Sequence, residues 1–144
     1  MQYNHCMETT IFEKIINREI PSHIVYEDED TIAILDINPK TKGHTLVIPK
    51  ALSRTVLEMN PETLGQYFAV VQKVAQAIKD SLKADGLNIL LNTESAGGQE
   101  VFHTHTHIIP RFTHDEVGLN TGPHQAYQDD ELIQYTELIK SYLS

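Results

Sequence analysis

Cysteine is nearly absent from the sequence: Cys6 is the single thiol among 144 residues. One thiol cannot form an intramolecular disulfide, and nothing in the chain indicates an oxidising compartment. The apolar runs are far shorter than the roughly 18–20 residues that a membrane-spanning helix requires. The first ten residues lack the charged stretch and apolar run of a signal peptide. We therefore expect a cytoplasmic protein that does not associate with membranes.

Basic residues are also scarce, since 11 Lys and Arg stand against 20 Asp and Glu, giving a formal charge of −9 at pH 7. Nucleic acids and anionic membranes are bound by basic surfaces, so neither is expected as a partner. The net charge does not exclude a small anionic ligand, because the local potential in a pocket can be opposite to that of the whole protein. Hydrophobic residues make up 40% and charged residues 22% of the chain, as in ordinary globular proteins. The length predicts one domain whose core needs no disulfide or metal.

The pattern of apolar residues predicts three helices and five short strands. The first helix begins with the capping box Thr10–Glu13, and the second begins at Asn60-Pro61, with Asn60 as N-cap. We expect Asp129 to cap the third. The predicted helices span 11–18, 61–83 and 130–143. The predicted strands span 22–27, 31–36, 45–49, 87–92 and 101–110, and the first three of them resemble an antiparallel meander.

Three histidines alternate with threonine in the segment His103-Thr104-His105-Thr106-His107. In a strand, residues two apart project from the same face, so the three imidazoles would share one side of a sheet. Such a row suits a divalent metal site, a proton relay, or a nucleophilic histidine oriented by its neighbours. A buried structural cluster is the remaining interpretation. The preceding small and amide residues favour the nucleophile, because glycine-rich backbone can approach a phosphate: Asn92, Ser95, Gly97, Gly98 and Gln99.

The chain resembles the histidine triad (HIT) family, specifically its bacterial Hint-like branch, from Thr10 to Arg111. The resemblance is carried by TIFEKIINREIPS, by LDINPKTKGHTLVIPK and by NTESAGGQEVFHTHTHIIPR. It implies an α+β fold: an antiparallel sheet of about five strands with one short helix, one long helix and a C-terminal helix. It also implies a homodimer with a continuous ten-stranded sheet. The expected organisation is a flexible N-terminus (1–9), a HIT domain (10–112) and a C-terminal loop and helix (113–144) packed on the domain or on the partner.

The same resemblance implies a hydrolase or transferase that cuts purine nucleotides at the α-phosphorus. The expected substrates are nucleoside phosphoramidates, aminoacyl adenylates or dinucleoside polyphosphates. His105 would be the nucleophile that forms a nucleotidyl-histidine, His107 would act on the leaving group, and His103 and His44 would complete the relay. Residues expected to bind the substrate are Asp36 at the ribose, Asn92, Gly98 and Gln99 at the phosphate, and Phe12, Ile20, Ile34, Leu35 and Ile37 around the base. A nucleotide sensor or scaffold with incidental turnover is the alternative.

Two positions depart from the family pattern. Many bacterial relatives carry Cys-x-x-Cys at the place of Thr10 to Glu13, and that pair helps to hold a structural zinc. Both thiols are missing here, so we expect no metal and no cofactor. Glu100 stands where several relatives have Ser or Thr facing the phosphate. Because a carboxylate would repel a phosphate, we expect the Glu100 side chain to turn away from it.

Overall fold

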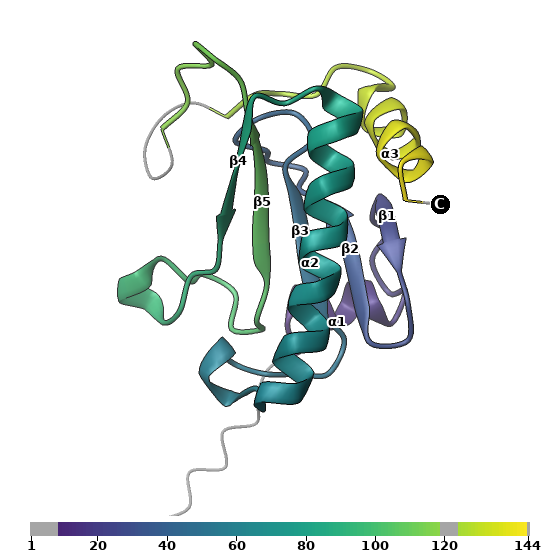
Figure 1. The fold of residues 1–144 in the computed structure, drawn as a ribbon. Helices are drawn as coiled ribbons and strands as arrows, with labels where there is room; N and C mark the ends of the chain where they lie inside the picture. Colours follow the sequence, from purple (N-terminus) through teal and green to yellow (C-terminus); the bar gives the residue numbers. More distant parts are fainter. Residues whose placement is uncertain (1–8, 119–123, 144) are drawn as a thin grey trace, which may run out of the picture.

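The computed structural model describes residues 9–118 and 124–143, and its centre is a five-stranded antiparallel sheet in the order β1-β2-β3-β5-β4 (Figure 1). Neighbouring strands are antiparallel throughout, so β1, β2 and β3 form the predicted meander. The strands are β1 (Ile24–Glu27), β2 (Thr31–Leu35), β3 (Thr45–Pro49), β4 (Gly86–Leu90) and β5 (Thr106–Arg111). The α+β class and the number of strands are confirmed.

The helices begin where local capping groups allow them to begin. In α1 (Ile11–Ile16), the Thr10 hydroxyl accepts the N–H of Glu13 at 3.2 Å. In α2 (Pro61–Leu82), the Asn60 side chain accepts the N–H of Thr63 at 2.8 Å. The remaining helical segments are α3 (Glu131–Ser141) and two 3₁₀ turns, η1 (Val56–Glu58) and η2 (Ser95–Gly97). None of the helices within the described ranges has the length and apolar character needed to cross a bilayer.

Two helix predictions need correction. The first helix ends at Ile16 rather than Arg18, because Asn17 already leaves the helical conformation and Arg18 has a positive φ of 62°. The N-cap of α3 is Asp130 rather than Asp129, and its side chain makes no capping hydrogen bond.

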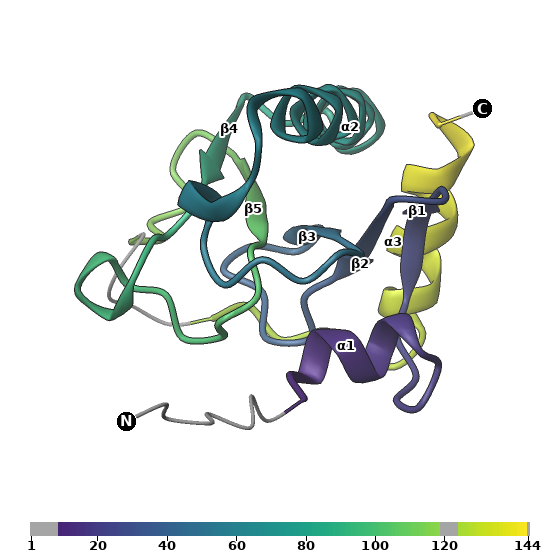
Figure 2. The same ribbon diagram turned by 90° about the horizontal axis from the view of Figure 1, so that it is seen from below.

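The sheet has two faces with different roles. On one face, Ala33 and Leu35 belong to a buried cluster formed with α2 and α3. On the other, residues one position away along the strands, Ile32 and Ile34, pack with Phe12 of α1. Figure 2 shows α2 on one side of the sheet and α1 on the other, with α3 beside β1. We call the side covered by α1 the histidine face, because the site described below lies there.

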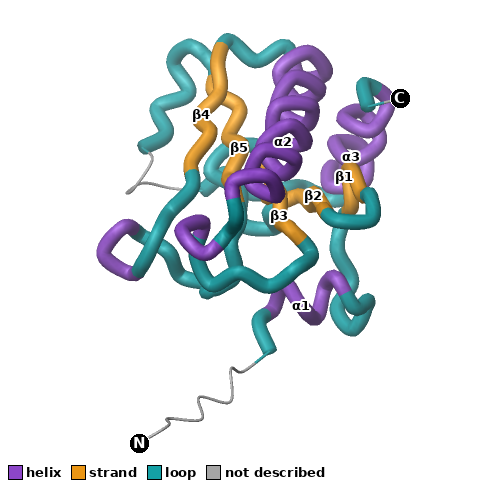
Figure 3. Tube along the Cα trace, turned by 60° about the horizontal axis from the view of Figure 1, so that its bottom comes forward, coloured by secondary structure: helices purple, strands orange, loops and turns teal. Residues whose placement is uncertain are grey.

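The strand predicted over 101–110 is much shorter, and β5 begins only at Thr106. β3 continues to Pro49, but its pairing with β5 stops at Val47 and Thr106, and β4 ends at Leu90, so the residues upstream of Thr106 leave the sheet. Their polar groups bond to a loop instead: Thr104 N–H donates to the Ser53 carbonyl at 2.8 Å. The loops that follow β3 and β4 gather at this end of the sheet (Figure 3). His103 and His105 therefore lie in a loop, and their predicted placement on a strand is wrong.

Candidate active site

Four predicted histidines come together on the histidine face, although only one of them lies in a strand. His107 is in β5, His44 directly precedes β3, and the loop before β5 supplies His103 and His105. The ring centroids of His105 and His107 are 5.0 Å apart, and those of His44 and His107 are 5.1 Å apart. Because these contacts run His44–His107–His105, the three rings form one connected row.

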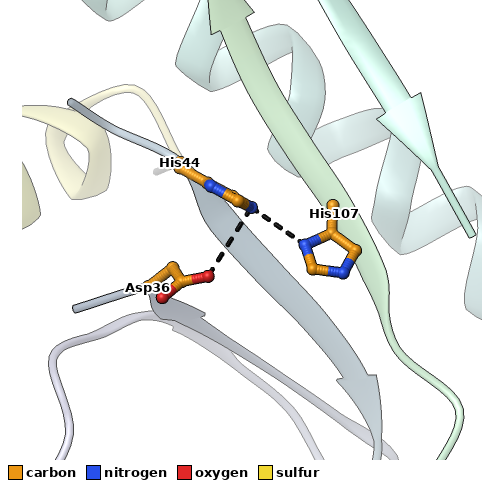
Figure 4. A group of neighbouring side chains, drawn as sticks. All are labelled: Asp36, His44 and His107. Atoms are coloured by element: carbon orange, nitrogen blue, oxygen red, sulfur yellow. Dashed lines mark hydrogen bonds and ion pairs between the residues drawn. The ribbon is translucent and has the colours of Figure 1, made fainter. Parts of the chain in front are cut away.

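The proton positions of His44 and His107 follow from a single backbone amide. The N–H of Lys40 lies 3.0 Å from His44 Nδ1, which must therefore accept, so neutral His44 carries its proton on Nε2. That Nε2 lies 2.9 Å from His107 Nδ1 and 3.7 Å from the Asp36 carboxylate (Figure 4). His44 thus donates to His107 Nδ1, and His107 in turn holds its own proton on Nε2. His107 is left with an N–H that His44 does not use.

His105 has the opposite arrangement. Its Nδ1 lies 2.7 Å from the carbonyl oxygen of His103, to which it donates, so its Nε2 holds the lone pair. The ring is buried, and Phe12 packs edge-on against it with centroids 4.8 Å apart. A nucleophilic nitrogen and a proton donor therefore lie on neighbouring rings. A displacement at an electrophilic phosphorus needs both groups.

His103 serves the site mainly through its main chain. Its ring is fully buried, and Nε2 donates to the Pro49 carbonyl at 2.7 Å. Its Nδ1 is the one buried side-chain nitrogen or oxygen without a hydrogen-bond partner in the described part of the chain. No ring contact joins it to the other histidines among the described residues, whereas it packs on Phe12 with centroids 6.1 Å apart. The main-chain carbonyl of His103 thus orients His105, and a part for the His103 ring in the relay stays a prediction.

Burial keeps the histidines neutral. It lowers the pKa of His44 from 6.5 to about 3, assisted by the nearby His107, His124 and Lys40. It lowers the pKa of His107 to about 4, assisted by His105. The pKa of His105 is also lowered, chiefly by burial. At pH 7 each of these rings is in the neutral form that can act as nucleophile or as hydrogen-bond relay.

Burial raises the pKa of the Asp36 carboxyl, whereas the hydrogen bond from the Asn38 N–H and the nearby His124 and Lys40 side chains act to lower it. Oδ1 of Asp36 accepts the Asn38 N–H at 2.8 Å, which fixes the carboxylate at the end of β2. The other oxygen, Oδ2, faces His44 at 3.7 Å. Asp36 thus stands at the edge of the histidine row, with acceptor capacity to spare for hydroxyl groups.

The structure also tests whether the site could hold a metal. Ligand atoms of Asp36, His44 and His107 lie within 4.8 Å of one another. However, the Lys40 amide occupies His44 Nδ1 and forces the proton onto Nε2, the nitrogen that faces the other two residues. A metal needs a lone pair at that nitrogen, so these residues do not fit a metal site.

The position of the structural zinc known from bacterial relatives has different chemistry here. Thr10 uses its hydroxyl to cap α1, and Glu13 is the residue whose N–H it accepts. Neither residue supplies the thiolate that such zinc sites use, and Cys6 lies outside the described residues. The residues present therefore do not fit this zinc.

The residues predicted to surround the base divide between the two faces of the sheet. Phe12 and Ile34 are buried on the histidine face, and Ile20 packs against the same cluster. Ile37, just past the end of β2, is 71% exposed. Leu35 points to the α2 side, because neighbouring residues of a strand face opposite ways. The Leu35 side chain therefore lies on the other face from the histidines, and its contact with a base stays a prediction.

The loop that is predicted to bind the phosphate is stabilised by one of its own residues, Gln99. The Gln99 side chain is buried, donates to the carbonyls of Arg54 and Val101, and accepts the Glu94 N–H. Its backbone N–H also donates to Glu94. Gln99 therefore shapes the loop with its side chain and its main-chain N–H, and its contact with a phosphate stays a prediction.

Asn92 and Gly98 lie together in this loop, since the Asn92 amide donates to the Gly98 carbonyl at 3.3 Å. Gly98 has a φ of 94°, which favours glycine, and an added Cβ would stand 3.4 Å from that amide. Glu100 is exposed.

Sequence reasoning missed the groups that set the histidine tautomers. They are the N–H of Lys40 and the carbonyls of Pro49 and His103, all of them main-chain groups. No residue type marks such groups in a sequence. The nearest signal is Gly43, whose φ of 95° shapes the loop directly before His44.

The fold and site define a class of α+β proteins in which one sheet face carries a row of neutral histidines. The chain belongs to the HIT domain family, whose model matches residues 17–114. It is 54% identical over 108 residues to Protein hit of Bacillus subtilis, covering 75% of this chain and 74% of that one. It is 43% identical over 105 residues to the purine nucleoside phosphoramidase of Escherichia coli, covering 71% and 87%. The crystal structure of a Zn-bound histidine triad family protein from Mycobacterium smegmatis matches with a TM-score of 0.81 and 37% identity, covering 92% and 91%.

Proposed function

We propose that the protein is a purine nucleotide hydrolase or transferase that acts at the α-phosphorus through a nucleotidyl-His105 intermediate. The observation that carries the proposal is the pairing of tautomers: a lone pair on His105 Nε2 beside an N–H on His107 Nε2. A nucleotidyl transfer needs both at once, because one group attacks phosphorus while another protonates the departing group.

In the first step His105 Nε2 bonds to the α-phosphorus, and the bond from phosphorus to the leaving nitrogen or oxygen breaks. His107 gives its Nε2 proton to the leaving group while its Nδ1 takes up the proton that His44 holds on Nε2. The negative charge left on the His44–His107 pair is balanced by the positive His105 ring until the second step returns both protons. The positive charge that develops on the His105 ring is stabilised by the His103 carbonyl at Nδ1. In the second step water attacks phosphorus, His107 Nε2 takes up a proton from that water, and His105 departs. Protein groups supply every proton transfer, so the scheme assigns no role to a metal.

The substrate class follows from the lining of the site and from the relatives. The apolar side chains of Phe12, Ile20 and Ile34 suit a base, and Asp36 can accept hydrogen bonds from ribose hydroxyls. An apolar slot discriminates weakly among bases, since stacking does not read their edges. The Escherichia coli relative is named a purine nucleoside phosphoramidase. We therefore propose nucleoside phosphoramidates or dinucleoside polyphosphates as substrates.

We also propose that the protein forms a homodimer. A groove between α2 and β4 has a mostly apolar lining with Gln72, Gln76 and Lys79 among it, and two of its apolar residues, Phe68 and Ile89, are 39% and 51% exposed. β4 is also an edge strand of the sheet, free to extend it across a second copy. Both features support a contact in which the two sheets become one of ten strands.

The test is release of AMP from adenosine 5′-phosphoramidate, in EDTA, by the wild type and by His105→Ala. We expect turnover by the wild type and a loss of at least about 1,000-fold in the variant, with AMP binding retained. His23→Ala removes a histidine from outside the cluster and serves as the matched control. AMP binding by a wild type that does not turn over would defeat the proposal and favour a nucleotide sensor.

A further inference from the structure

The C-terminal segment 124–131 holds the loop that joins Asp36 to His44. The Gly43 N–H donates to the Tyr127 hydroxyl at 2.8 Å, and the Lys42 N–H donates to Gln125 Oε1 at 2.7 Å. Three further contacts join the same two segments: His124 Nδ1 to the Asn38 carbonyl, His124 Nε2 to Lys40 Nζ, and Lys42 Nζ to the Glu131 carboxylate. The loop is thus fixed by residues more than eighty positions away in the chain.

The backbone amides of this loop donate to different partners, so the position of the loop decides which hydrogen bonds form. The N–H groups of Lys42 and Gly43 go to the C-terminal segment, while the N–H of Lys40 goes to His44 Nδ1. The His44 N–H returns to the Thr41 carbonyl at 3.0 Å. A shift of Gly43 would therefore move Lys40 and His44 relative to each other. Such a shift would release the amide that fixes the His44 tautomer.

Tyr127 is itself well placed to act as a fixed support. Its ring packs edge-on against Tyr135 of α3, with centroids 5.6 Å apart. α3 is anchored in turn by Ile139, which is fully buried in the cluster under α2. A continuous line of contacts thus joins the C-terminal helix to Gly43 and to the first residue of the histidine row.

We infer that Tyr127 is a positioning residue for the histidine row: its hydroxyl holds Gly43 so that the Lys40 amide keeps the His44 proton on Nε2. His44 then presents that proton to His107 Nδ1, and His107 keeps its own proton on Nε2. The catalytic consequence rests on the proposed function, in which that proton is given to the leaving group. The tautomer itself does not depend on any substrate. The charged or titratable groups that face His44 are Asp36, Lys40, His107 and His124.

The variant that tests this inference is Tyr127→Phe, which keeps the ring and its packing on Tyr135 but removes the hydroxyl. Tyr142→Phe is the matched control, because that tyrosine is 50% exposed on the end of α3. Long-range ¹H–¹⁵N correlation spectra of the histidine rings, recorded at pH 7 without substrate, report each tautomer directly. We expect Nε2–H for His44 and His107 in the wild type and in the control, and a mixture of tautomers at His44 in Tyr127→Phe.

Turnover of adenosine 5′-phosphoramidate gives the second measurement. We expect kcat of Tyr127→Phe to fall about tenfold with KM nearly unchanged, as for other residues that orient a reacting group. Gln125→Leu, which removes the neighbouring acceptor, should shift the His44 tautomer in the same direction. Unchanged tautomers in both variants would overturn the inference, even if their melting temperatures fell. A shifted tautomer in a protein without turnover would uphold the positioning role and defeat the proposed function instead.

Discussion

Acid should destabilise the protein through the buried histidines, and replacing His107 by Gln should remove the share of that effect that His107 contributes. His107 has a pKa of about 4 in the folded protein against 6.5 when unperturbed, so the unfolded chain takes up its proton first as the pH falls. The stability it contributes is full above pH 6.5 and is lost between 6.5 and 4. At pH 5 the loss is about 2 kcal/mol, at about 1.4 kcal/mol per pH unit. His44, with a pKa of about 3, adds a similar loss at that pH.

The assay is urea unfolding at pH 7.5 and pH 5.0, with the free energy of unfolding extrapolated to water at each pH. We expect the wild type to lose about 2 kcal/mol more than His107→Gln over this interval. Carboxylates of the unfolded chain begin to take up protons near pH 5, but they are common to both proteins and cancel in the difference. Equal losses in the two proteins would show that His107 is not held neutral by burial, which would refute the reasoning.

Two further predictions concern the loops around the site. Gly43→Ala should lower the free energy of unfolding by more than about 1 kcal/mol, because Gly43 has a φ of 95° and an added Cβ would lie 2.3 Å from Leu82 Cδ1. Gly65→Ala in α2, where a Cβ meets nothing within 4 Å, should instead stabilise by about 0.5–1 kcal/mol, and thermal unfolding of both variants checks the contrast. Gln99→Glu should lower the melting temperature, since a carboxylate cannot donate to the Arg54 and Val101 carbonyls, and the unfolding cost should be about 1–3 kcal/mol. Isothermal calorimetry should show unchanged AMP affinity for Gln99→Glu; a large loss of affinity would identify Gln99 as a phosphate ligand.

Elements set by local chemistry could be predicted from the sequence. Asn60 and Pro61 start α2, Thr10 starts α1, and the β-branched runs of the meander became β1, β2 and β3, because caps and side-chain periodicity act within a few residues. The four histidines also came together as the family resemblance implied. The start of β5 was predicted wrongly, because it depends on strands that are distant in the sequence. β5 starts at Thr106 because β4 ends at Leu90 and Thr104 bonds to the loop at Ser53 instead of continuing along β3.

The finer organisation of the site depended on groups that a sequence does not display. The His44 tautomer is set by the main chain of Lys40, and the His105 tautomer by the main chain of His103. Gln99 carries a side chain suited to a phosphate, yet it makes three hydrogen bonds, two within its own loop and one to the Arg54 carbonyl in the loop after β3. In each case tertiary geometry, rather than residue type, decides what the group can do.

In the proposed reaction His105 bonds covalently to phosphorus, and the stereochemical course at that phosphorus shows whether it does. A substrate with a chiral α-phosphorothioate, hydrolysed in ¹⁸O-labelled water, shows whether the configuration at phosphorus changes. Two in-line displacements, first by His105 and then by water, each invert the configuration, so we expect net retention. Net inversion would mean that water attacks directly, and it would contradict the nucleotidyl-His105 intermediate.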